Sequence, residues 1–218
     1  MLENPRSPRV RAVAKLSKRA ARQETGLFLL EGPQAAREAL AWAPETVLEV
    51  YATPSALEKH TDVRDAAEQA GVDLQITTEA VLDAMADTVT PQGIVAVARQ
   101  SPTALKDILA GEPRLIAICE EVRDPGNLGT IIRAADAAGA DAVILTGRTV
   151  DPYNPKVVRS TTGSLFHLPV AVDLELADVV ARAHEAGLRI VAADVEGTDF
   201  LASRELLSEP TAWLFGNE

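Results

Sequence analysis

The sequence is poor in cysteine and in long hydrophobic runs. Its one cysteine among 218 residues, Cys119, excludes an internal disulfide bond and any zinc site built from several cysteines. The apolar stretches, such as residues 114–119 and 141–145, are strand-sized and fall short of the roughly 18–20 residues that a membrane span needs. The basic N-terminus has no apolar segment of the kind found in secretory signals. We therefore expect a cytoplasmic protein.

Aromatic residues are also few, at 4% of the chain, whereas 47% of the residues are hydrophobic and 24% are charged. This composition excludes a fibrous repeat and a disordered chain. A chain of this length can bury one large hydrophobic core or two modest ones.

A net positive charge is absent, since the formal net charge is −11, and this argues against broad, non-specific binding to nucleic acid. The charge is uneven, however: residues 1–22 carry +6 and the remaining residues −17. Salt screens charges beyond about 8–10 Å, so the local potential governs phosphate binding. The segment is either a focused phosphate-binding face or a basic helix that only faces water. Its basic residues are Arg6, Arg9, Arg11, Lys15, Lys18, Arg19 and Arg22.

Hydrophobic periodicity divides the chain into two halves. In the first half, helices are expected at residues 9–23, 33–41, 55–70 and 78–86, and strands at 27–30, 47–52, 72–76 and 94–98. Residues 101–113 are rich in proline and glycine around a short helix at 105–109, which suits a linker.

The second half reads as an α/β domain. Strands are expected at residues 114–119, 141–146, 168–172, 188–193 and 211–215, with helices starting near residue 127 and at 175–186, and a long loop after residue 146. Strands that are apolar throughout and alternate with helices predict a largely parallel sheet covered on both faces.

The segment at residues 120–133 is the most informative for chemistry, because a buried strand ends there, a tight turn follows and a helix begins. Ligands of open α/β sheets bind beyond the carboxyl ends of strands. Helical spacing places Gly126, Gly129 or Thr130, and Arg133 on one face, where two glycines would leave room for a large group. The buried side is expected to carry Leu128, Ile131, Ala135 and Ala138. The alternative is a glycine-rich turn with a solvent-exposed arginine.

Other kinds of site fit poorly. The turn does not follow the G-x-G-x-x-G pattern of dinucleotide sites, and no phosphate-binding Walker loop is present. We expect His60, His167 and His184 to be structural or solvated, since no carboxylate spacing suggests a metal site. Cys119 is expected in the core.

The sequence EVRDPGNLGTIIR at residues 121–133 resembles the first signature motif of the SpoU/TrmH (SPOUT) family of RNA 2′-O-ribose methyltransferases. LFGNE at 214–218 is similar to the opening of the second motif, and DPYNPKVVRSTTGSLF at 151–166 resembles the family's loop after its second strand. GLFLLEG at 26–32 and TPQGI at 90–94 resemble the ribosomal-protein-like RNA-binding domain that precedes the catalytic domain in many members.

The resemblance implies an RNA substrate-binding domain at residues 1–100, a linker at 101–113 and an α/β-knot methyltransferase domain at 114–218. It implies S-adenosyl-L-methionine as the cofactor, a trefoil-knotted chain, a homodimer and RNA as the substrate, with ribosomal RNA favoured over transfer RNA. The family's third motif is not found before residue 218, so the second domain is expected to lack its last element and, as it stands, to bind the cofactor weakly or not at all.

By the same resemblance, Asn127 and Arg133 are catalytic, and the cofactor contacts are Gly216, Asn217 and Glu218. The candidate RNA contacts are Arg9, Arg11, Lys15, Lys18, Arg19, Arg22, Lys156 and Arg159. Two other classes remain open: a catalytically inactive RNA-binding module with the same fold, and a different nucleotide-binding α/β enzyme.

Overall fold

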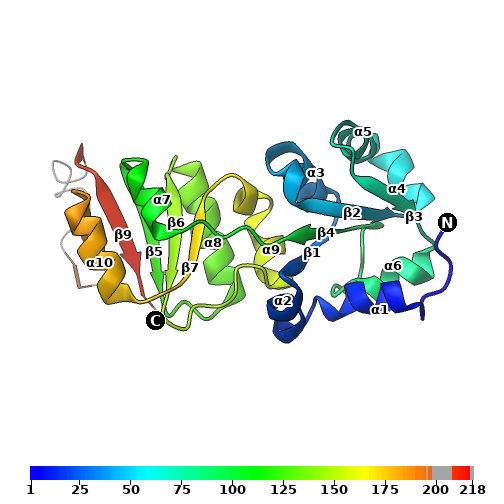
Figure 1. The fold of residues 1–218 in the computed structure, drawn as a ribbon, viewed down its shortest axis with the longest axis horizontal. Helices are drawn as coiled ribbons and strands as arrows, with labels where there is room; N and C mark the ends of the chain where they lie inside the picture. Colours follow the sequence, from blue (N-terminus) through cyan, green and yellow to red (C-terminus); the bar gives the residue numbers. More distant parts are fainter. Residues whose placement is uncertain (195, 198–207, 217–218) are drawn as a thin grey trace. The chain divides into compact units, whose positions relative to one another are not determined.

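The computed structural model describes residues 1–194, 196–197 and 208–216, and it divides the chain into two compact units (Figure 1). Unit 1 comprises Met1–Ser101 and Asp151–Phe166, and unit 2 comprises Pro102–Val150 and His167–Glu218. The division expected at residues 101–113 did not anticipate that residues 151–166 belong to unit 1.

Unit 1 is built on a four-stranded mixed sheet in the order β1-β4-β2-β3. Strand β4 runs antiparallel to both of its neighbours, and β2 and β3 are parallel. The strands are β1 (Leu27–Glu31), β2 (Val47–Ala52), β3 (Asp73–Ile76) and β4 (Ile94–Arg99). The helices of its first hundred residues are α1 (Pro8–Lys15), α2 (Arg19–Thr25), α3 (Pro33–Trp42), α4 (Pro54–Lys59), α5 (Thr61–Gln69) and α6 (Glu79–Met85), with a short 3₁₀ turn at Pro44–Thr46.

The apolar side of α1 belongs to the core of unit 1. Val10, Val13 and Leu16 are buried against β1, β2, β4 and α6, with Leu29 and Leu82 among their partners. The first helix therefore depends on this packing, because an isolated helix of eight residues is too short to be stable in water.

Two expected long helices are each broken in two. The expected helix at 9–23 is interrupted between Lys15 and Arg19, where Lys18 adopts an extended conformation as the N-cap of α2. The expected helix at 55–70 is interrupted at His60, whose φ and ψ are −123° and 59°. No proline or glycine marks either break, so local sequence gave no signal for them.

Unit 2 contains a five-stranded sheet in the order β7-β6-β5-β9-β8, and every pairing in it is parallel, as expected. Its strands are β5 (Leu115–Glu120), β6 (Ala142–Thr146), β7 (Val170–Leu174), β8 (Arg189–Ala192) and β9 (Thr211–Phe215). Its helices are α7 (Leu105–Ala110), α8 (Pro125–Ala137) and α10 (Leu176–Glu185).

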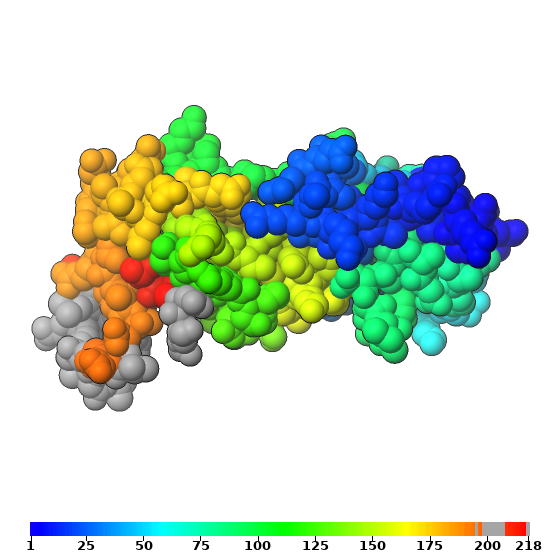
Figure 2. All heavy atoms as spheres, turned by 90° about the horizontal axis from the view of Figure 1, so that it is seen from below, coloured from blue at the N-terminus to red at the C-terminus, as the bar shows by residue number. Residues whose placement is uncertain are grey.

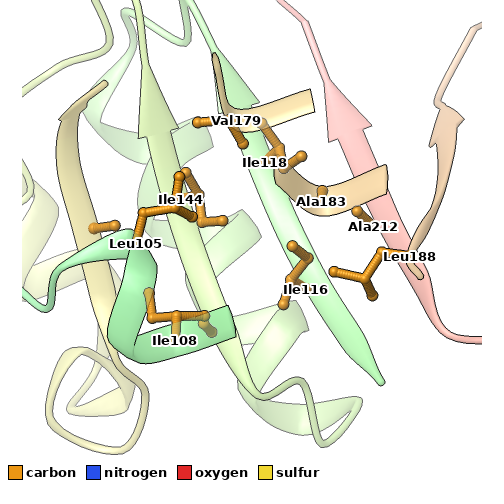
Figure 3. Close-up of a cluster of buried hydrophobic side chains, with 11 residues drawn as sticks. Leu105, Ile108, Ile116, Ile118, Ile144, Val179, Ala183, Leu188 and Ala212 are labelled. Atoms are coloured by element: carbon orange, nitrogen blue, oxygen red, sulfur yellow. The ribbon is translucent and has the colours of Figure 1, made fainter. Parts of the chain in front are cut away.

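Helices cover both faces of this sheet. Figure 3 shows side chains of α7 and α10, such as Ile108 and Val179, pointing onto Ile118 of β5 and Ile144 of β6. Helix α8 packs on the opposite face (Figure 1). The sheet is thus buried on both sides, which explains why its strands are apolar throughout.

The expected long loop after β6 contains helix α9 (Pro155–Thr161) and a 3₁₀ turn at Ser164–Phe166. Helix α9 begins at a proline, and the side chain of Asn154 caps it by accepting a hydrogen bond from the Lys156 N–H at 2.9 Å. Tyr153 and Phe166 pack on Phe28 of β1, with ring centroids 4.8 and 6.4 Å away. These aromatic contacts explain why the segment belongs to unit 1.

Among the described residues, no helix combines the length and apolar character that crossing a membrane requires. The same residues contain no group of three or more histidine, cysteine, aspartate or glutamate side chains that could hold a metal ion.

Candidate functional site

The order of the strands in unit 2 creates a switch point between β5 and β9. From β5 the chain adds β6 and then β7 on one side of the sheet, whereas β9 and β8 lie on the other side. In open parallel sheets such a reversal leaves a crevice beyond the carboxyl ends of the strands, and ligands bind there.

A hollow of about 500 Å³ lies at this switch point. Its walls come from the turn after β5, the start of α8, the residues after β8 and the end of β9. They are Val122, Arg123, Asp124, Asn127, Thr130, Ile131, Ala193, Asp194, Phe215 and Gly216. The volume falls within the range of about 300–1,000 Å³ that is typical of ligand sites.

The start of α8 is fixed by its cap. The Asp124 side chain accepts a hydrogen bond from the Asn127 N–H at 2.9 Å, and Pro125 occupies the first turn, where a missing N–H costs nothing. This cap directs the first turn of the helix, including Asn127, toward the hollow.

One face of α8 differs from the sequence expectation. Gly129 is buried with Leu128 and Ile132, so Thr130, not Gly129, shares the exposed face with Arg133. Of the four residues expected on the buried side, only Leu128 is fully buried: Ile131 and Ala135 are half-buried and Ala138 is exposed. Ile132 takes the place expected for Ile131. The register of a helix against its sheet depends on tertiary packing, and spacing alone left it open by one residue.

Arg133 lies outside the hollow's lining, whereas Asn127 is part of it. At 1.5 Å per residue, Arg133 stands about 10 Å along the helix from Gly126. Its side chain is exposed and makes no ion pair or hydrogen bond with the residues that the structure describes. It is therefore available to a ligand.

Gly216 lines the hollow and is exposed. A Cβ added to it would meet nothing within 4 Å, so the space beside it is open. The other two expected cofactor contacts, Asn217 and Glu218, lie outside the described residues.

The loops after β5 and β6 are bound to each other beside the hollow. Thr149 Oγ1 accepts a hydrogen bond from the Val122 N–H at 3.2 Å and donates to the Cys119 carbonyl at 3.0 Å. Glu121 accepts hydrogen bonds from the Arg123 side chain and from the Arg148 N–H at 3.0 Å. The Arg123 contact first, and then the Arg148 N–H, lower the pKa of Glu121 to about 2, so its carboxylate stays charged.

Glu121 also adopts a left-handed backbone conformation, with φ of 57°. Non-glycine residues avoid this region unless the surrounding contacts hold them there, and such strain clusters at functional sites.

Two residues of unit 2 behave as expected from the sequence. Cys119 is fully buried, and burial raises the pKa of its thiol to about 12, which makes it unreactive. His167 is structural, because its Nδ1 lies 2.8 Å from Asp136 Oδ2.

The basic residues of the first two helices fall into two groups. Four are exposed and form no ion pair with any described residue: Arg11, Lys15, Lys18 and Arg19. In Figure 2 the N-terminal residues, in dark blue, follow the surface of unit 1 in one continuous stretch.

Arg9 and Arg22 make intramolecular contacts instead. Arg9 pairs with Glu49, donates to the Tyr51 hydroxyl at 2.7 Å and lies over the Tyr51 ring. Arg22 has only 2% of its side chain exposed and pairs with Asp151 at 2.7 Å. The burial of Arg22 argues against the expected contact with RNA, because its guanidinium makes four hydrogen bonds within the protein and is shielded from solvent.

The two candidates on α9 also differ. Lys156 is exposed and forms no ion pair within the described part of the chain. Arg159 is about one third exposed, and it pairs with Glu31 at 3.3 Å and Asp87 at 3.2 Å. Helix α9 holds Arg159 in place, whereas the sequence suggested a loop.

The sequence analysis assigned only Asn127 and Gly216 of the hollow's lining to the site, and it placed Thr130 on the open face of the helix. Val122, Arg123, Asp124, Ile131 and Phe215 lie within the two motif segments and could have been included. Ala193 and Asp194 follow β8, and only the order of the strands brings them to the site.

Two family models match this chain. The SpoU rRNA Methylase family matches residues 114–218, which contain the hollow, and the MRM3-like substrate binding domain matches residues 7–96.

Curated relatives match over much or all of the chain. The 23S rRNA (guanosine(2553)-2′-O)-methyltransferase RlmP of Bacillus subtilis is 33% identical over 223 residues, which cover 100% of this chain and 82% of the relative. The 23S rRNA (uridine(2479)-2′-O)-methyltransferase of Streptomyces viridochromogenes is 39% identical over 135 residues, which cover 59% of this chain and 46% of the relative.

Solved structures align over all or nearly all of the chain. The AdoMet-bound rRNA methyltransferase of Sinorhizobium meliloti aligns with a TM-score of 0.82 at 31% identity, covering 100% of this chain and 80% of that one. The SpoU methyltransferase AviRb of Streptomyces viridochromogenes, in complex with AdoMet, aligns with a TM-score of 0.79 at 29% identity, covering 98% and 82%.

Proposed function

Since this chain belongs to the SpoU rRNA Methylase family, we propose that it transfers a methyl group from S-adenosylmethionine to a ribose 2′-hydroxyl of ribosomal RNA. The observation that carries the proposal is the hollow at the switch point between β5 and β9, inside the matched segment. Relatives named for 23S rRNA support a large-subunit RNA as the substrate. One is named for a guanosine and the other for a uridine, so the family does not fix the target base.

The residues of the hollow fit S-adenosylmethionine. Phe215 offers an apolar ring, the absent side chain of Gly216 leaves open space, and the Asp194 carboxylate can accept hydrogen bonds from hydroxyl or amino groups. The cofactor supplies a methyl group on a sulfonium, with its leaving group already activated. The protein then has to hold the ribose hydroxyl in line and manage its proton.

We assign the orientation of the hydroxyl and the stabilisation of its charge to Asn127 and Arg133, while the proton that the hydroxyl loses as the oxygen–methyl bond forms passes to water. The amide of Asn127 lines the hollow and can orient the ribose. A guanidinium is always protonated and cannot simply act as a base. Arg133 instead stabilises the negative charge that develops on the 2′-oxygen and grips an adjacent phosphate with two parallel hydrogen bonds.

RNA binding is proposed for residues 1–100 and catalysis for residues 114–218. Residues 101–113, which the sequence suggested as a linker, contribute helix α7 to the core of unit 2. Phosphate contacts are assigned to four exposed cations near the N-terminus, which are Arg11, Lys15, Lys18 and Arg19. Lys156 on α9 is assigned the same role. Arg9 and Arg159 contribute only as far as their carboxylate partners leave them free.

A homodimer, a trefoil-knotted methyltransferase domain and a cytoplasmic location are further parts of the proposal, supported by the family resemblance. Light scattering coupled to size-exclusion chromatography measures the first of these. A monomer at micromolar concentration would contradict the dimer.

The proposal is tested by isothermal titration with S-adenosylmethionine and by transfer of a tritiated methyl group to unmodified 23S rRNA. We expect the full-length protein, with any residues that follow Glu218, to bind and to methylate, and residues 1–218 alone to bind the cofactor weakly or not at all. In the full-length protein, Gly216→Leu should lose cofactor affinity because the side chain fills the hollow. The control Ala138→Leu adds bulk at the exposed end of α8 and should leave affinity unchanged. RNA binding without cofactor binding or methyl transfer would favour the inactive RNA-binding module instead.

A further inference from the structure

A second polar cleft lies in unit 1, at the edge of the sheet where β1 and β2 end and β4 begins. The Gly32 N–H donates to the Ile94 carbonyl at 2.9 Å, and the Thr53 N–H donates to the Gly93 carbonyl at 3.0 Å. These bonds bring together three segments that are far apart in the sequence: the residues after β1, those after β2 and those before β4.

Two hollows of about 650 and 320 Å³ open at this edge, and Gln34 and Gln92 line both of them. The larger hollow is also lined by Pro33, Arg37, Thr53, Ser55, Ala56, Lys59, His60, Glu79, Pro91 and Gly93. Arg159 and Thr162 line the smaller one. We call the two hollows together the glutamine cleft.

The floor of the glutamine cleft requires glycine. Gly93 has φ of 78°, and a Cβ there would lie 2.6 Å from Ala56 Cβ and 2.9 Å from Thr53 Oγ1. Gly32 has φ of 87°, and a Cβ there would lie 3.0 Å from Gln92 Oε1. The segments can approach this closely only because neither position carries a side chain.

The glutamine cleft is lined by amides and by charges of both signs, whereas a surface that binds phosphates is mainly positive. Its charges have both signs: Lys59 and Glu79 both line the larger hollow, and Arg37 pairs with Asp62. The side chain of Gln92 makes no hydrogen bond with the residues that the structure describes. Gln34 donates to Glu38 at 2.8 Å and accepts from Arg37 at 2.9 Å, which leaves one amide hydrogen and one lone pair for a ligand.

We propose that the glutamine cleft holds one unpaired nucleotide of the RNA substrate and that Gln34 and Gln92 read the edge of its base. The inference rests on the proposed function and names where the substrate RNA is recognised. Proteins recognise RNA sequence mainly through unpaired bases whose edges are hydrogen-bonded, and a side-chain amide matches a neighbouring donor and acceptor on a base. The cleft is large enough for a nucleoside and is built mainly from residues that match the substrate binding domain.

The test compares Gln34→Ala/Gln92→Ala with the control Gln69→Ala, an exposed glutamine at the end of α5. Filter binding and steady-state methylation use an unmodified 23S rRNA transcript and a random-sequence RNA of equal length, and circular dichroism checks the fold. We expect the double variant to raise Kd and KM for the transcript about 10- to 100-fold, since one bidentate base contact is worth that much. The kcat and the affinity for S-adenosylmethionine should remain unchanged.

Salt dependence separates base reading from charge. Because no phosphate contact is lost, the slope of log K against log salt should stay the same in the double variant, and its preference for the transcript over random RNA should fall. An unchanged Kd, or a Kd raised equally for both RNAs with a smaller slope, would overturn the proposal. Failure of the wild type to methylate would count against the proposed function alone, because filter binding needs no cofactor and still tests the cleft.

Discussion

Replacing Arg22 by alanine should destabilise unit 1 strongly. Its Nε and Nη2 donate to Asp151 Oδ2 at 2.8 and 2.7 Å, and its Nη1 donates to the carbonyls of Leu16 and Ser17 at 2.9 and 3.0 Å. The side chain thus holds the turn between α1 and α2 and joins it to the start of the 151–166 segment. Neither partner of the ion pair is well hydrated, since 2% of the Arg22 side chain and 15% of the Asp151 side chain are exposed.

The magnitude follows from what alanine leaves behind. Arg22→Ala removes the cation and leaves a mostly buried carboxylate and two carbonyls without this partner, and breaking a buried pair in this way costs about 3–5 kcal/mol. In Arg22→Ala/Asp151→Ala the orphaned carboxylate is gone as well. The double variant should therefore lose less stability than the sum of the two single variants, with a coupling energy of about 0.5–3 kcal/mol.

The assay is guanidinium unfolding followed by far-UV circular dichroism, in which the helices of unit 1 contribute to the signal. Arg19→Ala is the matched control, because Arg19 is exposed in the same helix and should change the free energy of unfolding by no more than about 0.5 kcal/mol. If Arg22→Ala lies within 1 kcal/mol of Arg19→Ala, the reasoning from buried charge is refuted.

Three further predictions concern charge. Arg133→Lys should lower the single-turnover methylation rate about 10²- to 10³-fold with cofactor affinity nearly intact, because lysine cannot form the planar fork; a rate within threefold of wild type would contradict this. Neutralising Arg11, Lys15, Lys18 and Arg19 together should reduce the log–log salt slope of RNA binding by a few units, at about 0.7–0.9 per phosphate contact, and an unchanged slope would show that these helices only face water. The pKa of Glu121, about 2, lies below its ordinary value of 4.5. Its contribution to stability is therefore present above pH 4.5 and is lost as the pH falls toward 2. In Glu121→Gln the free energy of unfolding should change less with pH between 4.5 and 2 than in the wild type, and an equal change would contradict this.

The strands were the most predictable part of the fold. The bounds of β2 at Val47–Ala52 and β9 at Thr211–Phe215 agree with the expected residues, because short apolar runs between turn residues leave little choice. The crevice after β5 was also foreseen in outline, since a buried strand followed by a capped helix places the intervening turn at the edge of a sheet.

Features that depend on distant pairing could not be predicted from the sequence. The order β5-β9-β8, which brings Asp194 to the hollow, is set by which strands pair across the sheet. The burial of Arg22 depends on Asp151, 129 residues away. The local sequence predicts a solvent-exposed side chain for both arginines of α2, yet only Arg19 is exposed and Arg22 is buried.

The strained turn after β5 shows how this site is held in place before any ligand binds. Glu121 keeps its left-handed backbone because its carboxylate accepts from Arg123 on its own loop and from the Arg148 N–H on the next loop. A glycine would relieve the strain but would lose both hydrogen bonds, and with them a tie between the loops after β5 and β6. Groups that are already held in place stabilise the charge of a transition state without a free-energy cost for ordering them, and this is the main source of electrostatic catalysis. Arg123 lines the hollow and donates to the Glu121 carboxylate, so the strained turn at Glu121 also helps to position a charged group in the wall of the proposed cofactor site.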